Sequence, residues 1–256
     1  MAFVLEAACG SFIGTARNEN EDNFYFNNLF LPDENEEFNG VISCTLDTDK
    51  MQTFALFDGM GGELLGREAA LTATTVFAEC VRNKEKNKLD NKHFFADFCS
   101  KADDRICELA YESCVNTCGT TFAGIIYEGE NVICCNIGDS KIFRIYENKI
   151  SQISAEHTDK EILEKMGIEK KPVLLQYLGI KKHNVKIEPY FVKGTIKSNS
   201  YFVICSDGIT DVIPPSSIYK YIKKYENSQL AVQAVLQEAK HLNALDNSTI
   251  IIIKAI

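Results

Sequence analysis

Short apolar runs separated by turn signals dominate the hydrophobic pattern of this chain. The runs are rich in β-branched and aromatic residues, which favour pleated strands. Two pairs of runs flank short polar loops, at 128–131 and 147–149, and such a spacing predicts β-hairpins. The predicted strands are 23–31, 53–57, 121–127, 132–137, 142–146, 150–153, 201–205 and 249–253.

Three longer segments repeat apolar residues every three or four positions, a period that predicts helices. They span 63–83, 92–115 and 228–242, and a shorter helix is predicted at 158–167. The polar stretch 83–91 predicts a loop between the first two helices. Because the strands group in hairpins and do not alternate with helices, the pattern favours an α+β fold with antiparallel sheets.

One segment, 156–199, interrupts the strand pattern, since it is polar, contains many lysines and has weak periodicity. Segments of this length without regular structure are often functional lids in compact domains. The rest of the 256 residues contains no internal repeat, low-complexity tract or proline-rich linker. We therefore expect a single domain over residues 1–256 that carries a variable flap at about 156–199.

Composition and charge exclude several classes of function. The formal net charge of −9 provides no global attraction to nucleic acid or anionic lipid. No uncharged apolar run reaches the roughly 18 residues of a spanning helix, and no secretory signal is visible. The ten cysteines lack paired Cys-x-x-Cys spacings, so we interpret them as small apolar core residues. We expect a cytoplasmic protein that binds neither nucleic acid nor membrane.

Three apolar runs end at an aspartate beside a glycine: Asp58, Asp139 and Asp207. A strand held by the core fixes the position of the short carboxylate at its end, and glycine allows a sharp turn and close approach of a ligand. A single Asp-Gly is more often an ordinary turn. Because the design is repeated, the functional interpretation is favoured.

Further acids flank two strands: Glu21 and Asp22 precede the first aromatic run, and Asp246 precedes the last run. Clustered carboxylates repel one another and are costly to bury without a counter-ion. All-oxygen ligands suit Mg²⁺ or Mn²⁺, and two such ions about 4 Å apart are common in phosphoester hydrolysis. Arg17 stands close before Asp22, where a guanidinium would grip phosphate oxygens.

These residues lie in a series of motifs that covers nearly the whole chain. The motifs are RNENED at 17–22, DGMGG at 58–62, CGTT at 118–121, NIGDS at 136–140, EHT at 156–158, SDGITD at 206–211 and DNST at 246–249. In sequence and order they resemble the motifs of the PP2C (PPM) family of metal-dependent protein serine/threonine phosphatases, in its bacterial-type form.

The resemblance implies a central sandwich of two antiparallel β-sheets flanked by helix pairs, with two Mn²⁺ or Mg²⁺ ions at one end. Asp58 matches the aspartate that bridges both ions, and Gly59 matches the glycine whose carbonyl binds one of them. Asp207 and Asp246 match terminal ligands of the other ion. Asp139 matches an acid that, with Asp207, can hold a third ion.

Other matches concern water and substrate. Glu21 matches an acid that acts through metal-bound water, with Asp22 beside it. Arg17 matches the phosphate-binding arginine, and His157 belongs to the motif that opens the flap. The implied substrates are phosphoserine and phosphothreonine proteins, which a partner Ser/Thr kinase would supply.

The expected reaction is hydrolysis without a phosphoenzyme, by in-line attack of a hydroxide that bridges the two ions. Arg17 and the ions stabilise the phosphoryl oxygens, and an acid must protonate the leaving alkoxide. Met60 stands where many eukaryotic members carry a histidine, and it has no proton to donate. Metal-bound water is therefore the expected acid, and His157 is a weaker alternative.

Two alternative functions stay open on this fold. A regulatory pseudophosphatase would lack metal ligands, so the presence of Asp58, Asp207 and Asp246 disfavours it. A small-phosphoester phosphatase or a nuclease would use the same ions; the net charge of −9 argues against nucleic acid, whereas the sequence does not exclude small esters.

The flap lysines allow two interpretations. We interpret them as a solvated surface, and the alternative is attraction of acidic phosphopeptides. They are Lys165, Lys170, Lys171, Lys181 and Lys182.

Overall fold

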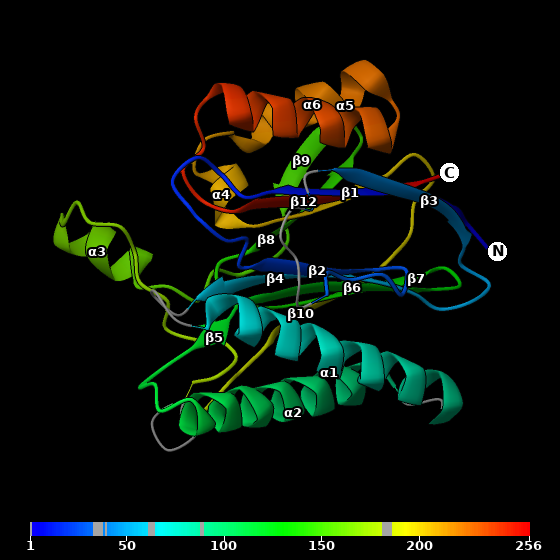
Figure 1. The fold of residues 1–256 in the computed structure, drawn as a ribbon. Coiled ribbons are helices and arrows are strands. Elements are labelled where there is room, and N and C mark those ends of the chain that lie inside the picture. The colour runs from blue at the N-terminus through cyan, green and yellow to red at the C-terminus, as the bar shows by residue number, and fades with distance from the viewer. Residues whose placement is uncertain (1, 33–37, 39, 61–64, 88–89, 181–185) are drawn as a thin grey trace.

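The computed structural model describes residues 2–32, 38, 40–60, 65–87, 90–180 and 186–256. Two antiparallel sheets lie face to face, and helices cover the outer face of each (Figure 1). The predicted α+β class and the sandwich of two sheets are therefore confirmed.

The first sheet, sheet A, contains both ends of the chain. Its strand order is β3-β1-β12-β11-β8-β9, and β1 pairs with β12 from Leu5 opposite Ala255 to Phe12 opposite Ser248. The strands are β1 (Val4–Phe12), β3 (Val41–Asp47), β8 (Lys141–Tyr146), β9 (Lys149–Gln152), β11 (Tyr201–Cys205) and β12 (Ser248–Ala255). Formation of this sheet thus requires the N-terminal and C-terminal segments together.

The second sheet, sheet B, has the order β10-β7-β6-β4-β2, and the short β5 pairs with the end of β4. Its strands are β2 (Asp22–Phe26), β4 (Gln52–Met60), β5 (Gly119–Thr120), β6 (Phe122–Glu128), β7 (Asn131–Ile137) and β10 (Tyr190–Thr195). Most residues of β2, β4, β6 and β7 are buried on both faces. Double coverage explains why these runs are continuously apolar and do not alternate.

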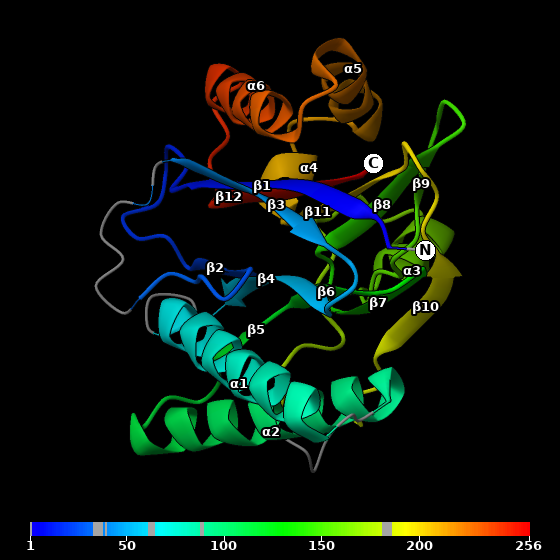
Figure 2. The same cartoon turned by 90° about the vertical axis from the view of Figure 1, so that its right-hand side faces the viewer.

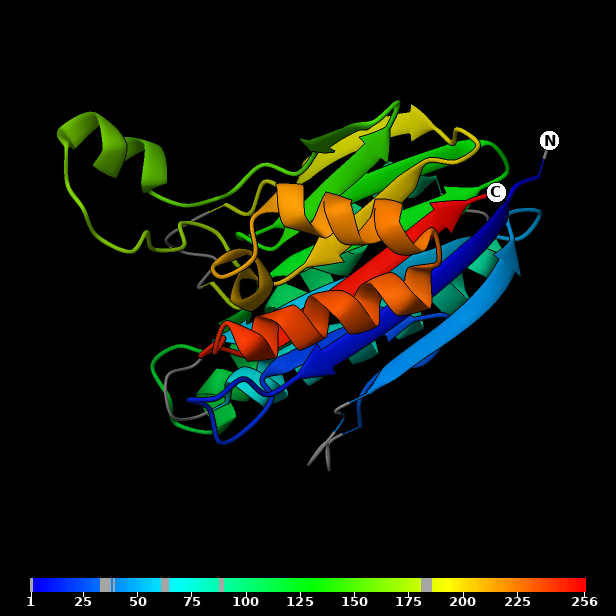
Figure 3. The same ribbon diagram turned by 90° about the horizontal axis from the view of Figure 1, so that it is seen from above.

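Helices form the two outer layers (Figure 2). α1 (Gly66–Asn87) and α2 (Asn91–Glu112) share one apolar cluster with sheet B. α4 (Asp207–Thr210), α5 (Pro215–Tyr225) and α6 (Ser228–His241) share another with sheet A. The remaining helix, α3 (Lys160–Met166), has no buried residue and projects away from the sandwich (Figure 3).

The space between the sheets is filled by aromatic and aliphatic side chains from both. Tyr127 of β6 meets Phe202 of β11 edge to face at 5.8 Å between ring centroids, and Phe54 of β4 meets Tyr127 at 6.1 Å. Burying each such side chain contributes about 1.5–3 kcal/mol. This apolar layer holds the two sheets in a fixed relation, so polar residues at one end of both sheets are held in a fixed relation too.

Several predicted elements differ from the structure. The run 23–31 is not one strand, because Asn27 and Asn28 adopt left-handed backbone angles (φ 48° and 66°) and turn the chain back after Phe26. The loop expected at 83–91 is largely helical, since α1 continues to Asn87. The first predicted helix began in residues 63–64, which lie outside the described part of the chain.

Other elements were missed from the sequence. Strand β1 contains small residues with a weak strand signal, and it is stabilised by pairing with β12 and β3 on its two sides. Helix α5 begins at a Pro-Pro pair, with Pro215 in its first turn, where proline is favoured. Strand β10 forms in the segment expected to be flap, and it extends sheet B at β7.

Two further expectations concern composition. All ten cysteines are free, and most are buried, with Cys114 exposed. They therefore serve mainly as core residues, as the sequence predicted. Among the described residues, no helix combines the length and the apolar character needed to cross a membrane.

Candidate active site

The topology places the candidate acids at one end of the sandwich. In sheet A, the end of β11 pairs with the start of β8 (Cys205 opposite Lys141) and lies near the start of β12. Asp207 follows β11, and Asp139 and Asp246 precede β8 and β12, so all three lie at this end. In sheet B, Asp22 stands directly opposite Asp58 on the neighbouring strand.

A hydrogen bond joins the acids of the two sheets. The hydroxyl of Ser206, at the end of β11, donates to Asp22 Oδ2 at 2.9 Å, and the same Oγ accepts from the N–H of Thr249 at 3.0 Å. Ser206 is fully buried. The buried serine thus links sheet A to the carboxylate of sheet B.

The sequence suggested that Asp58 ends a strand. In the structure β4 continues through Asp58 to Met60. The backbone of Asp58 is held by two threonines. Its N–H donates to Thr121 Oγ1 at 3.1 Å, and its carbonyl accepts from Thr120 Oγ1 at 3.0 Å and from the N–H of Thr121 at 2.9 Å. These contacts explain the Gly-Thr-Thr motif, whose threonines position Asp58.

The loop that carries Arg17, Glu21 and Asp22 is fixed by Asn247, a residue to which the sequence assigned no role. Its Nδ2 donates to the carbonyls of Ile13 and Glu19, both at 2.8 Å, and its Oδ1 accepts from the N–H of Glu21 at 2.9 Å. In the sequence, the one hint of this role is that Asn247 carries an amide and follows Asp246 directly in the last motif.

Gly59 lies where two segments approach its backbone closely. A Cβ atom at this position would stand 2.2 Å from the carbonyl oxygen of Gly66 and 2.6 Å from that of Glu21. Any other residue would push these segments apart. A Cβ at Gly66 would in turn meet the Glu21 carboxylate at 2.6 Å, so that carboxylate lies over the first turn of α1.

The acids repel one another and are partly removed from water, which favours their protonated forms. Burial raises the pKa of Asp22 to about 7, with Asp207 and Asp246 contributing, although hydrogen bonds from Thr249 and Ser206 oppose the shift. Burial and the charges of Asp22 and Asp207 raise the pKa of Asp58 well above its usual value.

The acids of sheet A show the same trend. Burial, followed by the charge of Asp207, raises the pKa of Asp139 to about 6, whereas Lys141 lowers it. Burial also raises the pKa of Asp207. Near Arg17, burial raises the pKa of Glu21, and the guanidinium opposes this shift.

Two cations, one before β2 and one in the flap, contact the acids. Arg17 forms a bidentate pair with Asp246, with Nε–Oδ1 at 2.9 Å and Nη2–Oδ2 at 3.0 Å, and its Nη1 lies 3.9 Å from Glu21 Oε2. Lys171 of the flap places Nζ 3.3 Å from Asp207 Oδ2. The second contact was not foreseen, because the two residues are distant in sequence.

His157 lies at the root of the flap, and its hydrogen bonds join it to Gly138 and Leu175 rather than to the acids. Its Nδ1 accepts from the N–H of Gly138 at 3.1 Å, and its own N–H donates to the Gly138 carbonyl at 3.0 Å. Burial lowers the pKa of His157. The imidazole therefore attaches the flap to the turn that carries Asp139.

Some sequence candidates cannot be placed. Gly61, Gly62, Lys181 and Lys182 lie outside the described residues. Within the described part, no group of three or more His, Cys, Asp or Glu side chains is gathered tightly enough to count as a metal cluster. In this arrangement Arg17 and Lys171 hold Asp246 and Asp207.

The residues nevertheless fit divalent cations. Asp22 is only 2% exposed, and its Oδ1 has no hydrogen-bond partner. Asp58 is paired with Asp22 across the strands. Its pKa is raised by the charges of four aspartates, of which Asp22 is one. A set of oxygen donors with excess negative charge suits Mg²⁺ or Mn²⁺.

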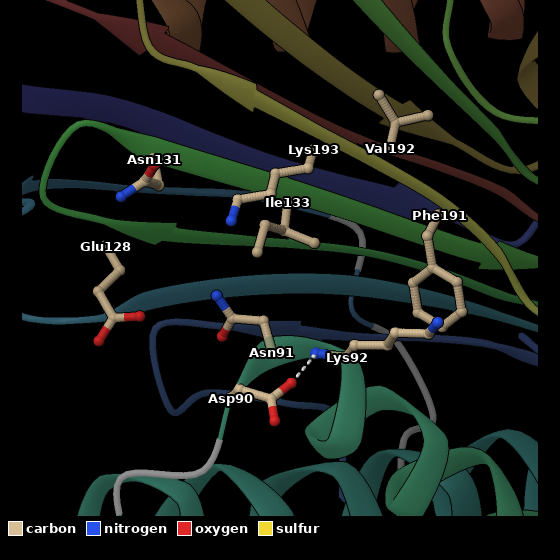
Figure 4. Close-up of a pocket in the computed structure, with 9 residues that line it drawn as sticks. All are labelled: Asp90, Asn91, Lys92, Glu128, Asn131, Ile133, Phe191, Val192 and Lys193. Atoms are coloured by element: carbon tan, nitrogen blue, oxygen red, sulfur yellow. Dashed lines mark hydrogen bonds between the residues drawn. The ribbon is translucent and has the colours of Figure 1, made fainter.

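A separate pocket of about 610 Å³ is lined by residues of α2, the β6–β7 hairpin and β10 (Figure 4). It includes Glu128 and Asn131 of the β6–β7 hairpin, at the opposite end of β7 from Asp139, together with the start of α2 and strand β10. Its lining combines carboxylates, lysines and apolar side chains, and it contains none of the candidate acids. We assign it no part in the chemistry.

Fold and site together define the class of protein: an α-β-β-α sandwich whose acidic residues converge at one end of both sheets. A family profile described as protein phosphatase 2C matches residues 42–245, most of the chain. The chain therefore belongs to the protein phosphatase 2C family. The resemblance drawn from the motifs is confirmed, and the enzyme class is protein serine/threonine phosphatase.

Curated relatives are distant but similar in length. A serine/threonine phosphatase, stp, of Listeria innocua is 23% identical over 234 residues, which cover 86% of this chain and 90% of the relative. The protein phosphatase PhpP of Streptococcus pneumoniae is 24% identical over 208 residues, covering 77% and 83%.

Solved structures show the same fold. The S. agalactiae serine/threonine phosphatase superposes with a TM-score of 0.79 at 19% identity, covering 98% of this chain and 99% of the other. The catalytic domain of the phosphatase PstP, solved in complex with two manganese ions, superposes with a TM-score of 0.76 at 20% identity, covering 99% of each chain.

Proposed function

We propose that this protein hydrolyses phosphoserine and phosphothreonine in proteins with the help of two Mn²⁺ or Mg²⁺ ions. The observation that carries the proposal is the pairing of Asp22 with Asp58 at the end of sheet B, beside Asp207 and Asp246 of sheet A. A structural role does not require so many acids at one place, since each raises the cost of ionising the others.

We assign the ions to Asp58, the carbonyl of Gly59, Asp207 and Asp246, with Asp139 and Asp207 as an optional third site. Glu21 and Asp22 lie beside these ligands and act through water. When bound, the ions supply positive charge that activates the attacking hydroxide and neutralises phosphoryl oxygens. The raised pKa values of Asp22 and Asp139 support this assignment, because a bound cation offsets both the burial and the repulsion that raise them.

Arg17 binds the substrate phosphoryl group in this proposal. Its side chain is 44% exposed, and the guanidinium already forms a bidentate pair with Asp246. A planar fork that binds a carboxylate also fits phosphate geometry. Binding there would hold the phosphorus beside the acids in a fixed orientation.

The proton for the leaving alkoxide is proposed to come from water at the centre. Met60 has no proton to donate. His157 uses Nδ1 as an acceptor for the Gly138 N–H, and burial lowers its pKa, so less of it carries the proton that a general acid would donate. We therefore assign His157 to the attachment of the flap.

The natural substrates are proposed to be phosphoproteins produced by a Ser/Thr kinase. Curated relatives bear the names serine/threonine phosphatase and protein phosphatase, which supports this substrate class. Ten free cysteines suit a reducing compartment, so we propose a cytoplasmic location.

The test is phosphate release from a phosphothreonine peptide with Mn²⁺, Mg²⁺ or EDTA. We expect release with either metal, loss with EDTA, and near-complete loss in Asp58→Asn. A matched control is Asp97→Asn, because Asp97 is an exposed acid of α2 paired only locally with Lys101. No metal-dependent release by folded protein would refute the proposal.

Substrate class is decided by parallel assays on a phosphopeptide, p-nitrophenyl phosphate and a nucleotide. We expect the highest kcat/KM on the phosphopeptide. A preference for the nucleotide would instead assign the site to small phosphate esters.

A further inference from the structure

Lys171 connects the flap to two carboxylates at the edge of the acidic centre. Its Nζ lies 3.3 Å from Asp207 Oδ2 and 3.5 Å from Asp211 Oδ2. Asp207 begins the one-turn helix α4, and the N–H of Asp211 donates to the Asp207 carbonyl at 2.7 Å, so both acids lie on one helical turn. One ammonium therefore bridges two acids that would otherwise repel, and it offsets part of their charge.

A short hydrogen-bonded ladder determines where Lys171 lies. The N–H of Leu175 donates to the His157 carbonyl at 2.8 Å. The N–H of Val173 donates to Asp159 Oδ1 at 2.8 Å, and the Asp159 N–H donates to the Val173 carbonyl at 3.2 Å. Because His157 is in turn bound to Gly138, the ladder extends from the turn that carries Asp139.

Proline follows Lys171 directly, at position 172. The residue before a proline is restricted to extended backbone conformations. Lys171 is therefore held between a fixed ladder and an acidic target, and less entropy is lost when its side chain forms the pair. This arrangement distinguishes Lys171 from an ordinary surface lysine.

The Lys171 pair is built to break more easily than the Arg17 pair. The Lys171 side chain is 68% exposed and makes a single contact to each acid, whereas Arg17 grips Asp246 with two nitrogens. Exposed single ion pairs contribute little and are screened by salt. A divalent cation bound to Asp207 would also repel an ammonium that contacts the same carboxylate.

We propose that Lys171 is a built-in competitor for the divalent cation at Asp207, so that it sets how tightly this side of the centre binds metal. In the metal-free protein the ammonium offsets part of the charge of Asp207 and Asp211. A cation at Asp207 displaces it and detaches this part of the flap from α4. The inference rests on the proposed function, since it takes Asp207 as a metal ligand.

The test measures Mn²⁺ binding directly, by isothermal titration calorimetry at low salt, without substrate. Lys171→Met removes the charge and keeps the length of the side chain. We expect it to bind Mn²⁺ about three- to tenfold more tightly than the natural protein at one site, as expected for removal of one or two exposed ion pairs. In about 0.5 M NaCl the difference should shrink, because exposed charges are screened.

Two control variants separate local competition from a general charge effect. Lys170→Met removes the neighbouring exposed charge, and we expect affinity within about twofold of the natural protein. Lys171→Arg keeps the charge and should retain the weaker affinity. Amide hydrogen exchange gives an independent readout: Mn²⁺ should increase exchange in residues 171–175 of the natural protein but change it little in Lys171→Met.

The possible results are distinct. Equal Mn²⁺ affinity for Lys171→Met and Lys170→Met, in protein that binds Mn²⁺, would overturn the competition and leave the proposed function intact. Weaker binding by Lys171→Met would also overturn it, since the lysine would then support the site. No Mn²⁺ binding by the folded natural protein would overturn both proposals.

Discussion

Asp22 and Asp103 are carboxylates with the same exposure, 2% each, in very different surroundings. Asp103 lies on α2 and accepts the N–H of Gly179 at 2.9 Å, which anchors the returning end of the flap. Asp22 accepts from Ser206 with one oxygen, while its other oxygen has no partner and its neighbours include further acids. Burial alone therefore does not mark a functional acid; what marks Asp22 is its acidic neighbours together with a carboxylate oxygen that lacks a partner.

The difference has an energetic meaning. A buried carboxylate that receives a backbone hydrogen bond stabilises the fold, and losing it leaves a buried donor unsatisfied. A buried carboxylate among other acids opposes folding until a cation arrives. The region around Asp103 is thus complete without a ligand, and the region around Asp22 is not.

The largest expected effect separates these regions by activity. Asp207→Asn removes a proposed ligand and should lower the Mn²⁺-dependent kcat/KM on a phosphothreonine peptide at least about a hundredfold. Asp103→Asn lies outside the centre and should lower it less than about tenfold, measured at a temperature where both variants are folded. Equal losses would remove the distinction between the two acids.

A smaller effect is expected at the phosphate-binding side. Arg17→Lys keeps a charge but loses the bidentate fork, so kcat/KM should fall about ten- to a hundredfold. Mn²⁺ affinity should change little, because lysine keeps the positive charge beside Asp246. Steady-state kinetics and calorimetry on the same preparation test both statements, and a loss of metal binding alone would contradict the assignment.

In EDTA, substitution should destabilise the protein at Asp103 but not at Asp22. Asp103→Ala leaves the Gly179 N–H without its acceptor and should cost about 1–3 kcal/mol. Asp22→Asn removes a charge that is unfavourable in the metal-free protein, so the free energy of unfolding should be unchanged or increase. Urea unfolding followed by circular dichroism measures both; destabilisation by Asp22→Asn would mean that its carboxylate is structural.

The smallest expected effect is the dependence of metal stabilisation on pH. Burial raises the pKa of Asp22 to about 7 and that of Asp139 to about 6. Since the unfolded value is about 4, the folded metal-free protein binds more protons than the unfolded chain between about pH 4 and pH 7, and its stability falls as pH rises through that window.

Cations compete with these protons, so the gain in Tm on adding Mn²⁺ should grow as pH rises from about 5 to about 7.5. Differential scanning fluorimetry with Mn²⁺ or EDTA at each pH tests this. In the Asp22→Asn variant the gain in Tm should depend less steeply on pH. A gain that does not depend on pH would indicate that Mn²⁺ binds elsewhere.

Local sequence was sufficient for the fold class and for most candidate acids. Strand runs around Asp58, Asp139 and Asp207 are strongly apolar, and each carries its acid and glycine within a few residues. Hydrophobic periodicity likewise predicted α2 and α6 closely, because each buries one face along its length. Each of these signals is local, because it is contained within one continuous segment of the chain.

The contacts that make the site depend on packing between distant segments. Asp58 meets Asp22 only because β2 pairs with β4, and Arg17 meets Asp246 only because β1 pairs with β12. The hydrogen bonds of Asn247 and the pair of Lys171 with Asp207 also join segments that are distant in sequence. Hydrophobic periodicity specifies which face of a segment is buried but not which segment lies against it. The apolar layer between the sheets settles that choice, and with it which charges face one another at the acidic end.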